Sequence, residues 1–201
     1  MSQFDWDKLA DGLSGEEARY ALKLKKRLGG IETQKQRQDE FMPFVKHMWP
    51  DFIEGEHHKI FAKQLEAVAH GKSKRLIVNM PPRHTKSEFA SVYFPAWMMG
   101  RNPKLKIIQA THTTELATGF GRKCKAVVNS PPFQESFPEV KISPESQAAG
   151  RWNTVDGGEY FAAGVGAAIT GRGADLLIID DPHSEQDALS STSFEACYEW
   201  Y

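Results

Sequence analysis

Residues 78–88 read VNMPPRHTKSE, and this stretch decides how the rest of the sequence is interpreted. The standard phosphate loop, G-x-x-x-x-G-K-[ST], wraps backbone N–H groups around phosphate oxygens and places its Lys on the outer phosphates and its hydroxyl on Mg²⁺. Lys86 and Ser87 match the end of that motif, but Met80 and Thr85 stand at its two glycine positions. Taken alone, Thr-Lys-Ser is more often a basic turn than a nucleotide site, so the flanking residues have to decide.

The sequence on either side supplies the context that a phosphate loop requires. Residues 75–80, RLIVNM, form a short apolar run that predicts a buried strand, and the pattern from Lys86 to about Met99 predicts a helix. Glycine is favoured in such loops because the backbone bends tightly and approaches the phosphates closely. In this chain a Pro-Pro pair can stiffen the loop instead. The order strand, loop and helix therefore predicts a nucleotide site formed by Pro82, Arg83, His84, Thr85, Lys86 and Ser87.

An acidic strand provides the second half of the predicted site. Residues 175–182 read DLLIIDDP, in which four apolar residues run into two carboxylates and end at a proline. Ligands of open parallel sheets bind at the C-terminal ends of the strands. We therefore expect Asp180 to hold Mg²⁺ together with Ser87, and Asp181 to orient or activate the attacking water. The alternative is a strand that ends in two solvated aspartates, although adjacent carboxylates repel each other without a cation.

Phosphoryl transfer also needs a cation for the charge that develops on the transferred group. Arg83 lies inside the loop and could serve its own nucleotide. Arg172 lies between two glycines in TGRGAD, which allows an exposed loop tip that reaches a neighbouring subunit. A surface turn is the equally simple interpretation of Arg172.

Composition excludes several classes of protein. The 201 residues carry a formal net charge of -1 and a pI near 6.7, which argues against a protein coated in basic charge for nucleic-acid binding. Cys124 and Cys197 form no C-x-x-C pair, so we expect reduced thiols. The N-terminus has no secretory pattern, and no apolar run reaches the roughly 18 residues that a membrane span needs. We expect a cytosolic protein without a membrane span.

The first part of the chain predicts helices. Residues 14–38 favour a short helix that breaks at Gly29-Gly30, and a second helix then runs to Trp49-Pro50. Residues 57–71 favour another helix with Gly71 as its C-terminal cap. His57, His58 and Gln64 on this helix precede the loop, and we assign them to core or surface rather than to a nucleotide base.

The second part predicts strands that alternate with helices. LKIIQAT, residues 105–111, predicts a buried strand, with Thr113 or Thr114 capping the helix that follows. Residues 130–158 predict a long excursion with at most short strands, residues 159–170 a strand or hairpin, and the tail a helix. The alternation predicts an α/β fold with a mainly parallel sheet between helices on both faces. We expect a helical N-terminal segment, residues 1–45, and a phosphate-loop domain, residues 46–201.

Read in order, five stretches resemble the large terminase subunit of tailed bacteriophages. They are WPDF (49–52), residues 57–88, residues 94–123, WNTVDGG (152–158) and GVGAAITGRGADLLIIDDP (164–182). The resemblance covers roughly residues 41–201, and it is specific because the variant loop, the middle strand and helix, and the Gly-Arg-Gly segment before the acidic strand occur together. It implies a P-loop ATPase of the additional-strand type, and family members often carry irregular phosphate loops.

The resemblance also implies the role of this domain. Such domains drive a ring motor that packages double-stranded DNA into a procapsid, with ATP and Mg²⁺ as cofactors and with the portal protein and the small terminase subunit as partners. The expected location is the host cytoplasm, at the procapsid vertex. By position, Lys86 and Ser87 match the loop Lys and hydroxyl, Asp180 the Mg²⁺-associated Asp, and Asp181 the catalytic carboxylate. Arg172 corresponds to the arginine finger that acts on a neighbouring subunit.

The sequence departs from the family pattern in three ways. Thr85 replaces the usual glycine before the Lys and could crowd the phosphates, and Asp181 stands where many members have Glu. No nuclease domain follows Asp181, so we predict no DNA cleavage by this chain. Two alternatives remain open: a fragment that binds nucleotide or partners without turnover, and a helicase-like ATPase, which single-stranded DNA would activate preferentially.

Overall fold

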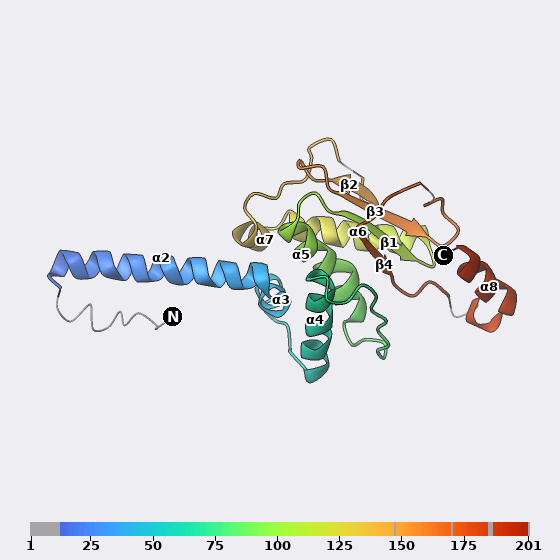
Figure 1. The fold of residues 1–201 in the computed structure, drawn as a ribbon, viewed down its shortest axis with the longest axis horizontal. Coiled ribbons are helices and arrows are strands. Elements are labelled where there is room, and N and C mark those ends of the chain that lie inside the picture. The colour runs from blue at the N-terminus through green and yellow to red at the C-terminus, as the bar shows by residue number, and fades with distance from the viewer. Residues whose placement is uncertain (1–12, 147, 170, 185–186, 201) are drawn as a thin grey trace.

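The computed structural model describes residues 13–146, 148–169, 171–184 and 187–200, and it has an α/β architecture (Figure 1). Helices and strands follow one another along the chain from a long N-terminal helix to a short C-terminal one. They are α2 (Gly15–Asp39), α3 (Phe41–Met48), α4 (Glu56–Ala69), the π-helical η1 (Glu88–Tyr93), α5 (Phe94–Arg101), β1 (Lys106–Thr111), α6 (Thr114–Val128), α7 (Pro131–Ser136), β2 (Arg151–Asn153), β3 (Glu159–Gly164), β4 (Leu176–Ile179), η2 (Asp187–Leu189) and α8 (Ser191–Trp200).

The sheet has four strands in the order β2-β3-β1-β4. β1 lies in the middle and pairs in parallel with β3 and β4, while the short β2 pairs antiparallel with β3. In this register Lys106 lies opposite Glu159, and Ala110 lies opposite Ile179. The expected mainly parallel sheet is therefore confirmed, and β1, β3 and β4 all end at the same edge.

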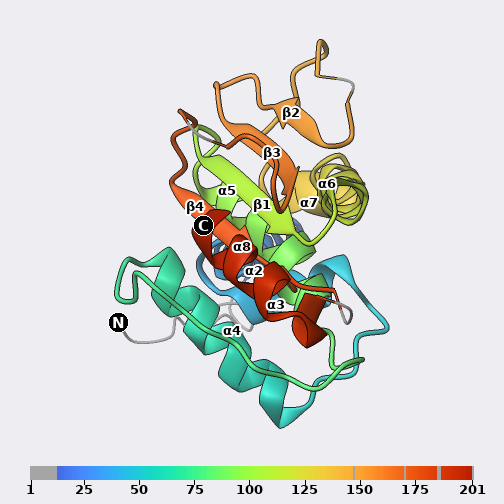
Figure 2. The same cartoon turned by 90° about the vertical axis from the view of Figure 1, so that its right-hand side faces the viewer.

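Helix α6 packs along β1 and β3 on one face of the sheet (Figure 2). Thr113 caps this helix as expected, because its side chain accepts a hydrogen bond from the Leu116 N–H. The close approach requires Gly164 at the end of β3, since a Cβ there would lie 2.5 Å from the backbone nitrogen of Thr114. In the edge strand β4, Leu177 remains exposed.

An aromatic cluster joins α3 to the helices that follow the loop. The centroid of the Phe41 ring lies 5.4 to 5.8 Å from the ring centroids of Phe89, Phe94 and Trp97, and all four side chains are buried. Phe44 extends the cluster toward α7. The expected boundary at residue 45 thus lies inside α3, whose N-terminal half belongs to this core.

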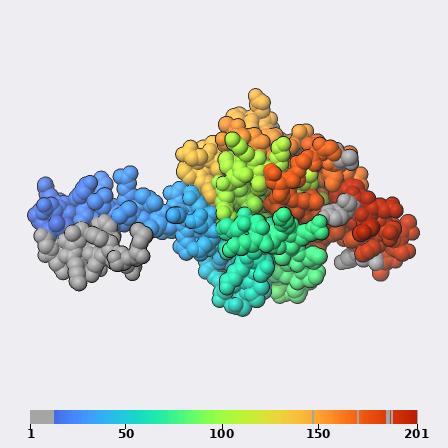
Figure 3. All heavy atoms as spheres, viewed as in Figure 1, coloured from blue at the N-terminus to red at the C-terminus, as the bar shows by residue number. Residues whose placement is uncertain are grey.

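Helix α2 extends away from the rest of the molecule (Figures 1 and 3). The expected break at Gly29-Gly30 is wrong, because a single helix runs from Gly15 to Asp39. Contacts near its C-terminus hold it in place: the Arg37 carbonyl accepts from Trp97 Nε1 at 3.0 Å, and Gln38 donates to the Ser136 carbonyl at 2.6 Å. The chain instead leaves the helix at Glu40, and α3 begins at the next residue.

The strand expected at residues 75–80 is also absent from the described structure. This stretch has no regular secondary structure and pairs with no described strand, and Ile77 is 88% exposed. Its alternate residues Leu76, Val78 and Met80 pack against the buried core. The apolar run therefore contributes side chains to the core without entering the sheet.

Candidate functional site

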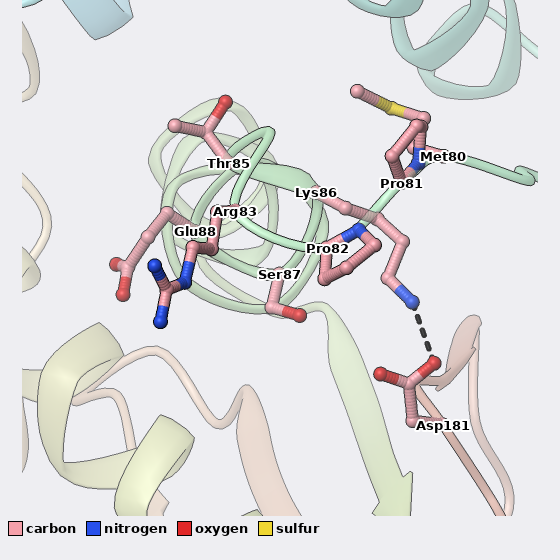
Figure 4. A pocket seen from close by; sticks show the side chains of 9 residues that line it. All are labelled: Met80, Pro81, Pro82, Arg83, Thr85, Lys86, Ser87, Glu88 and Asp181. Carbon is pink, nitrogen blue, oxygen red and sulfur yellow. Dashed lines mark hydrogen bonds and ion pairs between the residues drawn. The ribbon is translucent and has the colours of Figure 1, made fainter.

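The loop and the acidic strand meet at a cavity of about 450 Å³ (Figure 4). This volume is within the range of small-molecule sites, roughly 300 to 1,000 Å³. Most of the lining comes from the loop, and one residue comes from the end of β4. The lining residues are Met80, Pro81, Pro82, Arg83, Thr85, Lys86, Ser87, Glu88 and Asp181.

Lys86 connects the two halves of the site. Its Nζ lies 2.5 Å from Oδ1 of Asp181 and 3.4 Å from Oδ1 of Asp180. Burial disfavours the charged ammonium, but the ion pairs with the two carboxylates outweigh it and raise the pKa of Lys86 above its ordinary value. The structure therefore brings these three residues together, although they are 94 and 95 positions apart in the chain; their roles at a nucleotide site stay a prediction.

The backbone of the loop does without glycine by placing two other residues in the left-handed region. Arg83 has φ of 63° and Thr85 has φ of 60°, and Asp181 at the end of β4 has φ of 46°. Such conformations cost roughly 1 to 3 kcal/mol each and persist where the surroundings enforce them. The loop thus has the local bends that glycine usually supplies, at the cost of strain.

A buried hydrogen bond holds the side chain of Asp180 in place. Its side chain is 6% exposed and accepts a hydrogen bond from Ser91 Oγ at 2.9 Å, and Ser91 in turn accepts from Gln109 Nε2 at 3.2 Å. Ser91 lies in the π-helical turn η1, and π turns are frequent at functional sites. Sequence reasoning missed Ser91 and Gln109, because nothing in their spacing links β1, η1 and β4.

Ser91→Ala should destabilise the protein by about 1 to 3 kcal/mol, because it leaves buried polar groups without their partner. Asp180 would lose a donor, and Gln109 would lose its amide acceptor, while Gln109 Oε1 already has no partner among the described residues. Urea unfolding measures the change, with Ser191→Ala, at an exposed position of α8, as the control. Equal midpoints for Ser91→Ala and the wild type would contradict the anchoring role.

Asp181 is more accessible than Asp180, since its side chain is 63% exposed. Its backbone carbonyl accepts from the His112 N–H at 3.2 Å, which ties the end of β4 to the turn after β1. Its carboxylate faces the loop across the cavity (Figure 4). One carboxylate is therefore fixed and buried, and its neighbour is open to the cavity.

The two candidate arginines lie in different places. Arg83 lines the cavity, on the side away from Asp181 (Figure 4). Arg172 is not brought to this site: its guanidinium stacks 4.0 Å above the Phe161 ring and lies 3.4 Å from Glu159, at the opposite end of β3. A contact of Arg172 with a neighbouring subunit stays a prediction.

The rest of the predicted loop is held by local contacts. His84 Nδ1 lies 2.9 Å from the Pro82 carbonyl, and Thr85 Oγ1 donates to the His84 carbonyl at 2.6 Å. Thr85 also contacts His58 of α4 at 2.7 Å. The sequence analysis assigns His58 to the core or the surface. In the structure His58 is buried and contacts the loop directly. The sequence gives no sign of this contact, because the two residues are 27 positions apart.

The donor set fits a magnesium nucleotide. A cationic Lys86 and the first N–H groups of a helix, which have no intrahelical partner, suit phosphate oxygens. The hydroxyl of Ser87 and the carboxylate of Asp180 are the oxygen ligands that Mg²⁺ prefers. The arrangement can therefore bind an anionic phosphate group beside a divalent cation.

Within the described residues, no helix combines the length and the apolar character needed to cross a membrane. Comparison of the sequence with protein-family models gave no match, and comparison with curated proteins gave none either.

Proposed function

We propose that this chain is a Mg²⁺-dependent ATPase module and that it serves as the motor of a viral DNA-packaging terminase. The observation that carries the ATPase part is the convergence of Lys86, from the loop, with Asp180 and Asp181 at the end of β4, beside one cavity. The packaging role rests on the sequence resemblance to large terminase subunits. Double-stranded DNA, a ring of copies of this chain, the portal protein and the small terminase subunit are its proposed partners.

Each residue has a specific task in the proposed reaction. Lys86 binds the outer phosphates, which requires its ammonium to leave Asp181. Asp181, freed from Lys86, orients the attacking water and takes up its proton. Asp180 and Ser87 hold Mg²⁺, which when bound neutralises charge on the phosphates. Arg83, and Arg172 of a neighbouring copy, supply positive charge to the transferred group.

Phosphate release from ATP tests this proposal. The chain should release phosphate with Mg²⁺ but not with excess EDTA, and double-stranded DNA should stimulate release more than single-stranded DNA. Preference for single-stranded DNA would favour a helicase-like ATPase instead.

Lys86→Ala should lower phosphate release by at least about a hundredfold, because it removes a preorganised cation from the transition state. Lys74→Ala, which removes an exposed lysine before the loop, is the matched control and should keep wild-type turnover. Turnover that survives in Lys86→Ala would contradict the assignment of the loop.

Nucleotide binding without turnover is the second candidate function. It is favoured by the contacts of the Arg172 guanidinium, which lies over the Phe161 ring and 3.4 Å from Glu159 and would have to leave both to act on a neighbouring copy. Tight ATP binding with no phosphate release, in the presence of DNA, would support this candidate.

A further inference from the structure

Thr85 occupies a backbone conformation that a β-branched residue rarely adopts. Its φ is 60°, and the left-handed region places Cβ close to the following carbonyl oxygen. Thr85 also directly precedes Lys86, so any relaxation of its backbone would move the ammonium and the helix N-terminus. Some contact has to hold Thr85 in place.

The hydrogen bonds around His58 have only one consistent set of directions. The Gly55 N–H can only donate, and it lies 2.9 Å from His58 Nδ1, so Nδ1 is the acceptor. In the neutral ring the proton is then on Nε2, which donates to Thr85 Oγ1 at 2.7 Å. Thr85 Oγ1 donates onward to the His84 carbonyl at 2.6 Å. A continuous chain of donors therefore runs from the start of α4 into the loop.

The imidazole is packed against two aromatic rings that also touch each other. His58 is 5% exposed, and its ring centroid lies 4.8 Å from that of Phe52 and 5.3 Å from that of Phe89. Burial, together with His57 and His84, lowers the pKa of His58 against a smaller opposing effect of Glu54. The neutral tautomer that donates to Thr85 is therefore the favoured form.

We propose that His58 is a positioning residue that holds Thr85 in its left-handed conformation and thereby places Lys86 and Ser87 for phosphate binding. This proposal rests on the proposed nucleotide site. The hydrogen bond from His58 to Thr85 compensates for the glycine that the loop lacks. It follows that glycine at position 85 would make His58 dispensable for the loop.

A double-mutant cycle of His58→Phe and Thr85→Gly tests this dependence. His58→Phe keeps an aromatic ring packed against Phe52 and Phe89 but removes the donor. It should weaken binding of a non-hydrolysable ATP analogue by roughly two- to tenfold, the range expected from one net hydrogen bond. In the Thr85→Gly background the same change should have less than about a twofold effect, because no hydroxyl remains to be held. Equal effects in both backgrounds would overturn the proposal.

The neighbouring histidine provides the matched control. His57 is exposed, and its ring centroid lies 3.8 Å from that of His58 and 5.5 Å from that of His84 in the loop, but no hydrogen bond joins it to the loop among the described residues. His57→Phe should leave binding of the ATP analogue unchanged. A loss of affinity as large as that of His58→Phe would show that the packing of these aromatic rings, and not the hydrogen bond from His58, controls binding of the ATP analogue.

Hydrogen exchange of the nucleotide-free protein separates this proposal from the proposed function. Amides of residues 83–87 should exchange several-fold faster in His58→Phe than in the wild type, and no faster in the double variant than in Thr85→Gly. If the wild type binds no nucleotide, the proposed function fails, while this comparison still decides whether His58 holds the loop. Should His58→Phe not fold, Thr85→Val removes only the hydroxyl, and unchanged exchange would then contradict the proposal.

Discussion

Asp181→Asn should lower the turnover of ATP by about 10² to 10⁴ while tightening nucleotide binding. The loss follows from the proposed role of Asp181 as the general base, whose contribution is typically of that size. The gain follows from the ion pair in the structure, because Asp181 Oδ1 lies 2.5 Å from Lys86 Nζ and competes with the phosphates for it. A partly exposed ion pair contributes about 0.2 to 1 kcal/mol, so the affinity gain should be up to about fivefold.

Single-turnover kinetics and equilibrium titration measure the two effects separately. Asp156→Asn removes an equal charge from the exposed turn between β2 and β3 and should change neither quantity. If Asp181→Asn lowered affinity and left turnover intact, Asp181 would be a binding residue and the catalytic carboxylate would have to lie elsewhere.

Phe41→Ala should destabilise the protein by about 3 to 5 kcal/mol, as expected when a buried Phe is truncated in a core that cannot collapse. The Phe41 ring is 0% exposed and touches the rings of Phe44, Phe89, Phe94 and Trp97. Since domains are typically stable by only about 5 to 15 kcal/mol, this loss is a large part of the total. Urea unfolding at neutral pH measures it.

Leu22→Ala is the control for Phe41→Ala, because Leu22 lies on α2 and is 68% exposed. Its effect should stay within about 0.5 kcal/mol. A small effect of Phe41→Ala would mean that α3 is peripheral and that a boundary near residue 45 separates two independent units. A large effect would place α3 in the same core as η1 and α5.

Local patterns were sufficient to predict β1, β4 and the cap at Thr113, but not α7 (Pro131–Ser136), which lies in a stretch expected to contain at most short strands. β1 and β4 are short apolar runs bounded by polar residues, and Thr113 is a side-chain cap that can be recognised without tertiary information. The proximity of Lys86 to Asp180 agrees with the pattern of a phosphate-loop motif and an acidic strand, although residues 75–80 before the loop do not form the sheet strand that this pattern assumes.

The errors arose where tertiary contacts override local preference. Gly29-Gly30 disfavours a helix by roughly 1 kcal/mol per glycine, but the contacts of Arg37 and Gln38 with the rest of the molecule hold the C-terminal end of α2. Residues 75–80 have the composition of a buried strand, yet partners for a strand cannot be read from composition. Ser91 and His58 were missed for the same reason. Ser91 contacts Asp180, 89 positions later in the chain, and His58 contacts Thr85, 27 positions later.

The π-helical turn η1 holds more residues between the loop and the core than an ordinary α-helix would need. A π turn closes i→i+5 hydrogen bonds and so takes more residues than the α turn it replaces. Deleting one residue from Glu88–Tyr93 would therefore let an ordinary α-helix form without a large rotation of the residues before the turn relative to those after it. Phe94 and Trp97 could keep their places in the core while Lys86 and Ser87 kept their direction. A single-codon deletion in this turn would instead displace the residues inside it, and with Ser91 the hydrogen bond to Asp180.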